Sequence, residues 1–244
     1  MTEFTIQAAG VPVGVTAMFS STRDYCRAYF TDREPAFSVS TCREDLVFEQ
    51  NAAREEAIME GFRFRQFSDP YLERAAIHRK IGEHLFDYDT LVFHGSAVAV
   101  DGQGYLFTAK SGTGKSTHTR FWRETFGSRA VMVNDDKPFL RFTEAGVLIC
   151  GSPWSGKHGL DANITVPLKG LCILQRGMEN HIRRICPEEA MEMLLKQSIR
   201  PLDPEKLPKY QTLVKRLAAE TPLWQMACTR ERMAAEVAWG AMSK

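Results

Sequence analysis

The stretch Ala109-Lys110-Ser111-Gly112-Thr113-Gly114-Lys115-Ser116 has the form of a phosphate-binding loop, the Walker A motif, with Ala109 in place of the usual first glycine. In such a P-loop, backbone N–H groups cradle phosphate oxygens, the lysine reaches the β/γ-phosphates and the serine hydroxyl ligates Mg²⁺. Its two glycines supply backbone freedom that a side chain would block. The motif therefore predicts a site for ATP and Mg²⁺, with Ser116 as a metal ligand. The candidate nucleotide-binding residues are Ser111, Gly112, Thr113, Gly114, Lys115, Ser116 and Thr117.

The residues on either side of this loop fit a strand–loop–helix arrangement. Residues 104–109 are apolar and aromatic, which predicts a buried strand. Residues 116–126 carry three aromatic residues at helical spacing, and Gly127 reads as a helix stop. A helix that begins at Lys115 directs the positive end of its dipole toward the phosphates. The alternative is an ordinary strand–turn–helix that contains Gly-Lys-Ser by chance.

A second candidate element follows that helix. Residues 130–133 predict a short apolar strand, and Asn134, Asp135 and Asp136 come directly after it. Open α/β sheets bind their ligands at the carboxyl ends of strands, where these two carboxylates would lie. One aspartate can hold Mg²⁺, and the other can accept a proton from an attacking hydroxyl. A solvated acidic turn between two strands is the alternative interpretation.

The strand that leads into the loop has a predicted hairpin partner. Residues 94–100 form an apolar run that ends at Asp101-Gly102, and this dipeptide between two apolar runs is a hairpin signal. The acidic strand then comes after a single helix, with no strand between them. This order predicts an α/β fold in which the sheet is mixed rather than wholly parallel.

Together these residues resemble the catalytic domain of HPr kinase/phosphorylase, whose fold is shared more distantly with ATP-dependent phosphoenolpyruvate carboxykinase. The resemblance is carried by His94-Gly95, the hairpin, the P-loop and the Asp135-Asp136 pair, and it covers about residues 91–142. It implies a mixed-sheet P-loop nucleotide-binding core in which Lys115 contacts the β/γ-phosphates and Ser116 binds Mg²⁺. It also implies that Asp136 is the proton acceptor, with His94 nearby in the active site. Asp135 is the candidate carboxylate ligand of the metal. A histidine buried at a strand end and satisfied by the backbone is the alternative for His94.

The sequence departs from that family after the acidic pair. The family has a metal-binding glutamate before an Arg-Gly-Leu-Gly run, whereas residues 150–159 read Cys-Gly-Ser-Pro-Trp-Ser-Gly-Lys-His-Gly. HPr as a substrate and the reverse phosphorolysis reaction are therefore not carried over. Lys157 and His158 are candidate substrate residues, because they can reach a transferring phosphoryl group or an anionic acceptor. Trp154 is a candidate to cover a base or a substrate. A plain surface loop with a basic tip is the alternative.

The rest of the chain divides into a lead-in and a core. Residues 1–87 are expected to form a small α+β region, with strands at Gly10–Val15, Ala36–Ser40 and Leu46–Glu49 and helices at Ala52–Glu60 and 71–86. Residues 88–244 carry the nucleotide chemistry, with later strands expected at Lys137–Phe142, Val147–Cys150, Ile164–Gln175 and Pro222–Met226 and helices at 188–199, about 205–219 and 230–242. Arg176 lies at a predicted strand end, where we expect a solvated loop in preference to a phosphate contact.

Composition agrees with a soluble cytoplasmic enzyme. The 244 residues carry a formal net charge of +1, and no basic stripe interleaves with aromatic residues, so we expect no nucleic-acid partner. No apolar run approaches the length of a membrane span, so we expect no membrane partner. The six cysteines show neither zinc spacing nor a signal peptide before them, which favours reduced thiols. A homo-oligomer is compatible with these features.

The sequence thus predicts a kinase that passes the γ-phosphoryl group of ATP to a hydroxyl acceptor, with Asp136, Lys115, His94 and Asp135 as the candidate catalytic residues. The acceptor classes that fit are a small molecule, a peptide terminus and a protein serine. Two alternatives come from other classes of protein. One is a lyase similar to phosphoenolpyruvate carboxykinase, and the other is a non-catalytic module that binds a nucleotide.

Overall fold

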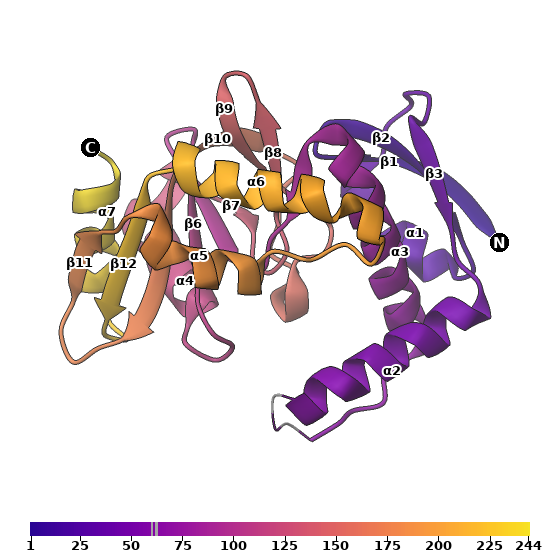
Figure 1. Ribbon diagram of the computed structural model, residues 1–244, viewed down its shortest axis with the longest axis horizontal. Helices are drawn as coiled ribbons and strands as arrows, with labels where there is room; N and C mark the ends of the chain where they lie inside the picture. The colour runs from indigo at the N-terminus through magenta and orange to yellow at the C-terminus, as the bar shows by residue number, and fades with distance from the viewer. Residues whose placement is uncertain (60, 62) are drawn as a thin grey trace. The chain divides into compact units, whose positions relative to one another are not determined.

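The computed structural model describes residues 1–59, 61 and 63–244, which form two compact units, residues 1–84 and 85–244 (Figure 1). In the first unit, three strands form a sheet in the order β1-β2-β3. Strand β2 (Val11–Ala17) pairs antiparallel with β1 (Thr2–Ala8) and parallel with β3 (Phe37–Ser40). The helices that accompany this sheet are α1 (Ser20–Tyr25), α2 (Arg43–Met59) and α3 (Asp69–Leu85).

A buried glutamate organises the first unit. Glu73 of α3 is fully buried, and its carboxylate accepts hydrogen bonds from the backbone N–H groups of Met18 and Phe19. It also accepts the hydroxyls of Thr22 at 2.5 Å and Thr41 at 2.8 Å. Helix α1 has no side-chain cap from its own N-cap residue. Phe19 is the N-cap residue of α1, so Glu73 satisfies one backbone N–H at the helix start and places a negative charge at the positive end of the helix dipole.

One prediction for this unit is wrong. Leu46–Glu49 is not a strand but lies inside α2, and the helix predicted at Ala52–Glu60 is the second part of the same helix, with Glu60 outside the described residues. A short apolar run fits a strand or a helix equally well by pattern alone. The Asp45 carboxylate accepts the backbone N–H of Cys42 at 3.0 Å, which places the helix start upstream of that run.

The second unit is built on a nine-stranded curled mixed sheet. Its main order is β4-β8-β9-β10-β6-β5-β7, with β12 beside β10 and β11 beside β12. Strand β10 pairs antiparallel with β9 through its first residues and parallel with β6 and β12 through its later ones, so the sheet changes neighbours along this strand. The strands are β4 (Thr90–Val92), β5 (Ser96–Val100), β6 (Gln103–Thr108), β7 (Ala130–Asn134), β8 (Phe139–Thr143), β9 (Gly146–Cys150), β10 (Thr165–Arg176), β11 (His181–Arg184) and β12 (Leu223–Cys228).

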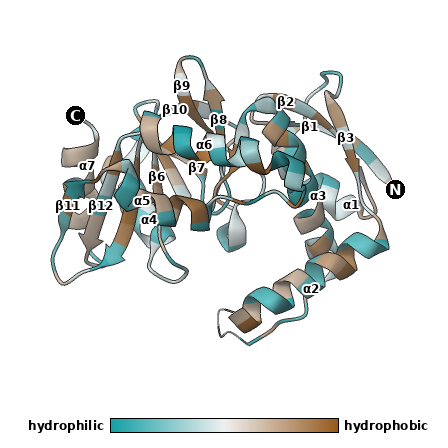
Figure 2. Cartoon of the chain, viewed as in Figure 1, coloured by the Kyte–Doolittle hydropathy of each residue, from teal (hydrophilic) through white to brown (hydrophobic). Residues whose placement is uncertain are grey.

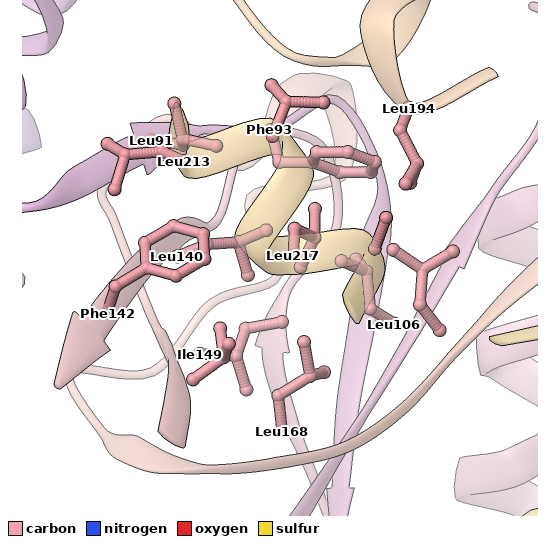
Figure 3. Close-up of a cluster of buried hydrophobic side chains, with 14 of the residues drawn as sticks. Leu91, Phe93, Leu106, Leu140, Phe142, Ile149, Leu168, Leu194, Leu213 and Leu217 are labelled. Atoms are coloured by element: carbon pink, nitrogen blue, oxygen red, sulfur yellow. The ribbon is translucent and has the colours of Figure 1, made fainter. Parts of the chain in front are cut away.

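Helices cover both faces of this sheet, because its central strands are apolar on both sides. Leu106 of β6 belongs to one buried cluster and its neighbours Tyr105 and Phe107 to another, as expected when successive side chains point to opposite faces. Figure 3 shows Leu213 and Leu217 of α6 pointing into the first cluster. In Figure 2 the strands of this unit are largely brown, whereas α6 carries both teal and brown residues. The helices are α4 (Lys115–Phe126), α5 (Pro187–Gln197), α6 (Leu207–Glu220) and α7 (Met233–Met242).

The second cluster lies between the sheet and the helices α4 and α7. The ring of Trp122 from α4 lies 4.8 Å from that of Tyr105 and 5.9 Å from that of Trp239 on α7, measured between ring centroids. Aromatic rings bury large apolar areas and favour tilted or edge-on contacts of this kind. The three aromatic residues expected on one helix face thus fix the helix that follows the candidate P-loop against the sheet.

The structure confirms a mixed α/β fold with a mixed sheet. The hairpin at Asp101-Gly102 joins β5 to β6, and the later strands and helices match the predicted ranges closely. In the described residues, no helix combines the length and the apolar character that crossing a membrane requires.

Candidate functional site

The candidate P-loop lies between β6 and α4, as its sequence predicts. Strand β6 ends at Thr108 and α4 begins at Lys115, with Gly114 as the residue before it. Gly112 has φ 72° and Gly114 has φ 122°, a region that favours glycine. A Cβ at either position would meet nothing within 4 Å, so backbone conformation and not crowding explains both glycines.

The side chain of Lys115 folds over this loop. Its Nζ donates to the carbonyl of Ala109 at 3.2 Å, and the N–H of Thr113 donates to the carbonyl of Lys110 at 3.2 Å. Burial lowers the pKa of Lys115 from its usual value, while the nearby charges of Asp136 and Asp135 act in the opposite direction. Ser111 and Gly112 are exposed, and residues 113–117 are half-buried, so the loop is accessible to a ligand.

The two aspartates lie at the same edge of the sheet as the loop. Strand β5 pairs antiparallel with both β6 and β7, so β6 and β7 run in the same direction. The loop leaves the carboxyl end of β6, and the aspartates follow the carboxyl end of β7. The start of β5 lies between them, since Ser96 pairs with Phe107 and Ala97 pairs with Asn134. Ligands of open α/β sheets bind at such an edge.

Asp135 is buried and held in place. Its Oδ1 accepts the hydroxyl of Ser96 at 2.5 Å, and the Ser96 Oγ lies 2.7 Å from the Oγ1 of Thr119 on α4. This chain of contacts joins β5, the turn after β7 and the helix α4 that follows the candidate P-loop. It fixes one carboxylate oxygen of Asp135 and leaves the other to a further partner. Ser96 and Thr119 were not identified from the sequence, because small hydroxyl residues on a strand and a helix carry no recognisable motif.

Asp136 lies beside His94. Its carboxylate Oδ1 is 3.5 Å from the Nε2 of His94, and both side chains keep about a third of their surface exposed (31% and 37%). Burial lowers the pKa of His94 to about 4, the charges of Lys115 and Lys137 add to this, and only Asp136 opposes it. The imidazole is therefore neutral at pH 7, so the contact is not an ion pair.

The backbone of His94 is satisfied as well. Its N–H donates to the carbonyl of Gln197 at 2.7 Å, and its carbonyl accepts the hydroxyl of Thr108 at 3.0 Å. The two interpretations of His94 from the sequence are thus compatible, because the backbone anchors the strand end while the imidazole faces Asp136. Gln197 at the end of α5 is a neighbour of this site that the sequence did not indicate.

Asn134 shapes the turn that carries the aspartates. Its side-chain Oδ1 accepts the N–H groups of Asp136 at 2.8 Å and Lys137 at 2.6 Å. Its Nδ2 donates to the carbonyl of Ser152 at 2.8 Å and reaches the Ser152 hydroxyl at 3.0 Å. An Asn that bonds the backbone two residues on forms an Asx-turn. Asn134 is fully buried, so it ties the acidic turn to the loop of residues 151–159.

That loop approaches Asp136 through a glycine. Gly156 has φ 69°, and a Cβ on it would lie 3.1 Å from the Cβ of Asp136 and 3.6 Å from its Oδ2. Lys157 and His158 follow directly in an exposed 3₁₀ turn, and no contact of their side chains is recorded within the described part of the chain. The structure thus places the segment that carries both residues at Asp136 without assigning either a partner.

The prediction for Trp154 is wrong. Its side chain is buried, and its ring packs edge-on against that of Phe139 at a centroid distance of 6.3 Å. A tryptophan in such a position anchors the base of the loop and cannot cover a base or a substrate. A Gly- and Ser-rich sequence context gave no sign that this ring belongs to the core.

The residues at this edge include oxygen donors suited to Mg²⁺. The second oxygen of Asp135 and the hydroxyl of Ser116 are of the type that Mg²⁺ prefers, and Mg²⁺ in nucleotide sites takes few protein ligands beside phosphates and waters. No cluster of three or more His, Cys, Asp or Glu side chains suited to holding a metal occurs in the described ranges of the chain.

Comparison with known proteins gives a limited result. No protein-family model matches this chain, and no curated protein does either. Among the solved structures that match is the HPr(Ser) kinase/phosphatase from Coxiella burnetii, with 16% sequence identity and a TM-score of 0.29. The match covers 51% of this chain and 93% of that one. At this TM-score the likeness is at most one of fold.

Proposed function

We propose that this chain is a kinase that transfers the γ-phosphoryl group of ATP to a hydroxyl acceptor. The proposal rests above all on one observation, namely that the P-loop-like turn with Lys115 and the turn with Asp135 and Asp136 follow the carboxyl ends of β6 and β7 at one sheet edge. Phosphoryl transfer depends on positioning and on charge stabilisation, and these three groups supply both. The order of motifs resembling HPr kinase supports the same assignment.

The different surroundings of the two aspartates support different roles. Asp135 is buried and bonded to Ser96, which suits a fixed ligand that holds Mg²⁺ together with Ser116. When bound, that ion would neutralise charge on the β- and γ-phosphates. Asp136 is more exposed than Asp135, and in the described contacts it bonds neither Ser96 nor Ser116. This suits a carboxylate that meets an acceptor hydroxyl. His94, neutral beside it, can orient the acceptor or the carboxylate by a hydrogen bond.

The proposed step is a direct displacement. The acceptor oxygen attacks the γ-phosphorus and forms a new P–O bond, while the bond from that phosphorus to the β,γ-bridging oxygen breaks and ADP leaves. The carboxylate of Asp136 accepts the proton of the acceptor hydroxyl. Lys115 and the backbone N–H groups of the loop stabilise the charge on the transferring group.

The acceptor is proposed to bind on the side of Asp136 that faces the loop of residues 151–159. Gly156 brings this loop against the carboxylate, and the exposed side chains of Lys157 and His158 come next in the chain. Cationic or hydrogen-bonding groups at this place favour an acceptor that carries a carboxylate or a phosphate beside its hydroxyl.

The experiment that tests the proposal is an ATP-consumption assay with Mg²⁺ against pooled metabolites and hydroxyl-bearing peptides, read out by product mass. The expected result is a product heavier by one phosphoryl group, formed by the wild type and lost with Lys115→Ala. Asp101→Asn is a matched control, because Asp101 lies in the β5–β6 turn and pairs only with Arg129 in the recorded contacts. A wild-type chain that binds no ATP contradicts the proposal, and tight Mg²⁺-dependent binding without turnover favours a binding module.

A further inference from the structure

Arg176 connects a neighbouring strand to the candidate P-loop. It is the last residue of β10, which runs parallel to β6 with Ile173 opposite Thr108. Both strands therefore end at the same edge of the sheet. The guanidinium NH2 of Arg176 donates to the carbonyl of Gly112 at 2.7 Å. This short charge-assisted contact spans 64 residues of sequence and reaches the middle of the loop.

The base of Arg176 is held firmly. The N–H of Gly177, the next residue, donates to the carbonyl of Cys228 at 3.0 Å, and a Cβ on Gly177 would lie 2.9 Å from the Cβ of Ala227. Asn180 accepts the N–H of Thr229 at 2.9 Å and closes the same turn. The exposed guanidinium is thus presented from a strand end that is fixed against β12.

The contact fixes the orientation of one peptide unit. The carbonyl of Gly112 and the N–H of Thr113 belong to the same planar trans peptide and point in opposite directions. A donor that holds the carbonyl on the outside of the loop therefore keeps the Thr113 N–H on the inside. In this structure that N–H points to the carbonyl of Lys110 within the loop. Gly112, with φ 72°, has no side chain to restrict this peptide otherwise.

We propose that Arg176 is a positioning residue of the phosphate loop, which holds the Gly112–Thr113 peptide, and with it the turn from Lys110 to Thr113, in the conformation that receives the polyphosphate of a nucleoside triphosphate. The role builds on the proposed function, because it presumes that the loop binds a nucleotide. The guanidinium of an arginine presents its N–H donors in a rigid plane and carries a positive charge. The ammonium of a lysine supplies the same charge without this fixed arrangement of donors. Preorganisation of this kind raises affinity by reducing the ordering cost of binding.

Three variants test this role. Arg176→Met removes the charge and the contact, and Arg176→Lys keeps the charge. The matched control is Arg184→Met, which removes an equal charge from β11, where Arg184 lies over the ring of Trp224 at 5.1 Å. ATP affinity is measured calorimetrically with Mg²⁺, and amide hydrogen exchange of residues 109–117 is measured without nucleotide.

The expected result is a Kd for ATP raised about five- to tenfold by Arg176→Met, a typical effect of one hydrogen bond to a charged group at a partly exposed site, and changed less than twofold by Arg184→Met. Arg176→Lys is expected to recover less than half of the binding free energy for ATP that Arg176→Met loses. The rate of amide hydrogen exchange of residues 109–117 is expected to rise in Arg176→Met and not in Arg184→Met. The positioning role is overturned if Arg176→Met binds ATP with the Kd of the wild type. It is also overturned if Arg176→Lys fully restores the affinity for ATP. Absence of ATP binding by the wild type instead overturns the proposed function, and the role with it.

Discussion

The Cα of Gly156 lies so close to Asp136 that a Cβ added to it would stand 3.1 Å from the Cβ of that aspartate. A side chain here requires Asp136, whose carboxylate we propose to accept the acceptor's proton, to shift by a few tenths of an ångström. We expect Gly156→Ala to lower the rate of phosphoryl transfer about tenfold or more, because small misplacements of a reacting group are costly. Steady-state kinetics with the identified acceptor measure this effect.

The same loop offers a control for that substitution. Gly159 also has a positive φ, at 59°, but a Cβ on it would meet nothing within 4 Å. Both alanine variants therefore carry a similar backbone strain of about 1–2 kcal/mol. If Gly159→Ala slows transfer as much as Gly156→Ala, general loop strain and not crowding of Asp136 accounts for the loss.

The bond from Ser96 to Asp135 predicts an effect on the metal requirement. Removal of this hydroxyl in Ser96→Ala frees the carboxylate that we propose to hold Mg²⁺. The Mg²⁺ concentration for half-maximal activity is expected to rise about tenfold, as is typical when a group that orients a ligand is lost. Ser243→Ala serves as a control, since the Ser243 hydroxyl bonds only the carbonyl of Trp239 in the recorded contacts. An unchanged Mg²⁺ requirement in Ser96→Ala argues against Asp135 as the metal ligand.

The hydrogen bonds of Asn134 predict a large loss of stability. Asn134→Ala leaves buried backbone groups of the acidic turn and of Ser152 without a partner, so the free energy of unfolding should fall by about 2–4 kcal/mol. Urea unfolding followed by tryptophan fluorescence measures this, since all four tryptophans belong to residues 85–244. Asn180→Ala, at the half-buried turn beside β12, should cost only about 1 kcal/mol. Equal losses in both variants contradict the special role of Asn134.

The buried imidazole of His118 should make the free energy of unfolding depend on pH. This buried imidazole accepts the indole N–H of Trp122 at its Nε2, at 3.1 Å, and burial lowers its pKa to about 3. The unfolded chain binds a proton near pH 6.5 that the folded chain does not, so the free energy of unfolding falls as pH drops below about 6.5. Between pH 7 and pH 5 the contribution of this residue is about 2 kcal/mol.

The comparison that isolates this contribution uses His118→Gln. Glutamine keeps an acceptor for the indole N–H and does not titrate. Urea unfolding at pH 7 and pH 5 should therefore show a smaller loss of stability in the variant than in the wild type. The same loss in both proteins shows that other groups dominate the acid sensitivity.

Much of the second unit, residues 85–244, was predictable from local patterns. The hairpin at Asp101-Gly102, the strand and helix around residues 109–114 and the acidic turn after β7 follow from turn residues, apolar runs and spacing. These signals lie within a few residues of the element that they specify. The strand prediction at Leu46–Glu49 also depended on a local signal alone, and it was wrong. An apolar run this short has no period that could separate a strand from a helix.

The contacts that complete the site depend on the tertiary fold and have no local signal. Ser96 and Asp135 are 39 residues apart, and Arg176 and Gly112 are 64 apart. Each pair meets only because β5 and β10 lie beside the strands that carry the loop and the aspartates. Gly156 resembles any loop glycine until its distance to Asp136 is known. Arg176 is exposed, as expected, but its guanidinium also bonds the carbonyl of Gly112 in the candidate P-loop.

The proposed roles of Lys115 and Asp136 are separated by measuring ATP binding and phosphoryl transfer in the same preparations of wild type, Lys115→Ala and Asp136→Asn. We expect Lys115→Ala to lose ATP binding. We expect Asp136→Asn to bind ATP within about threefold of the wild type but to transfer phosphoryl groups about 100-fold to 10,000-fold more slowly, the range typical of a lost general base. Full transfer by Asp136→Asn to an identified acceptor contradicts the account.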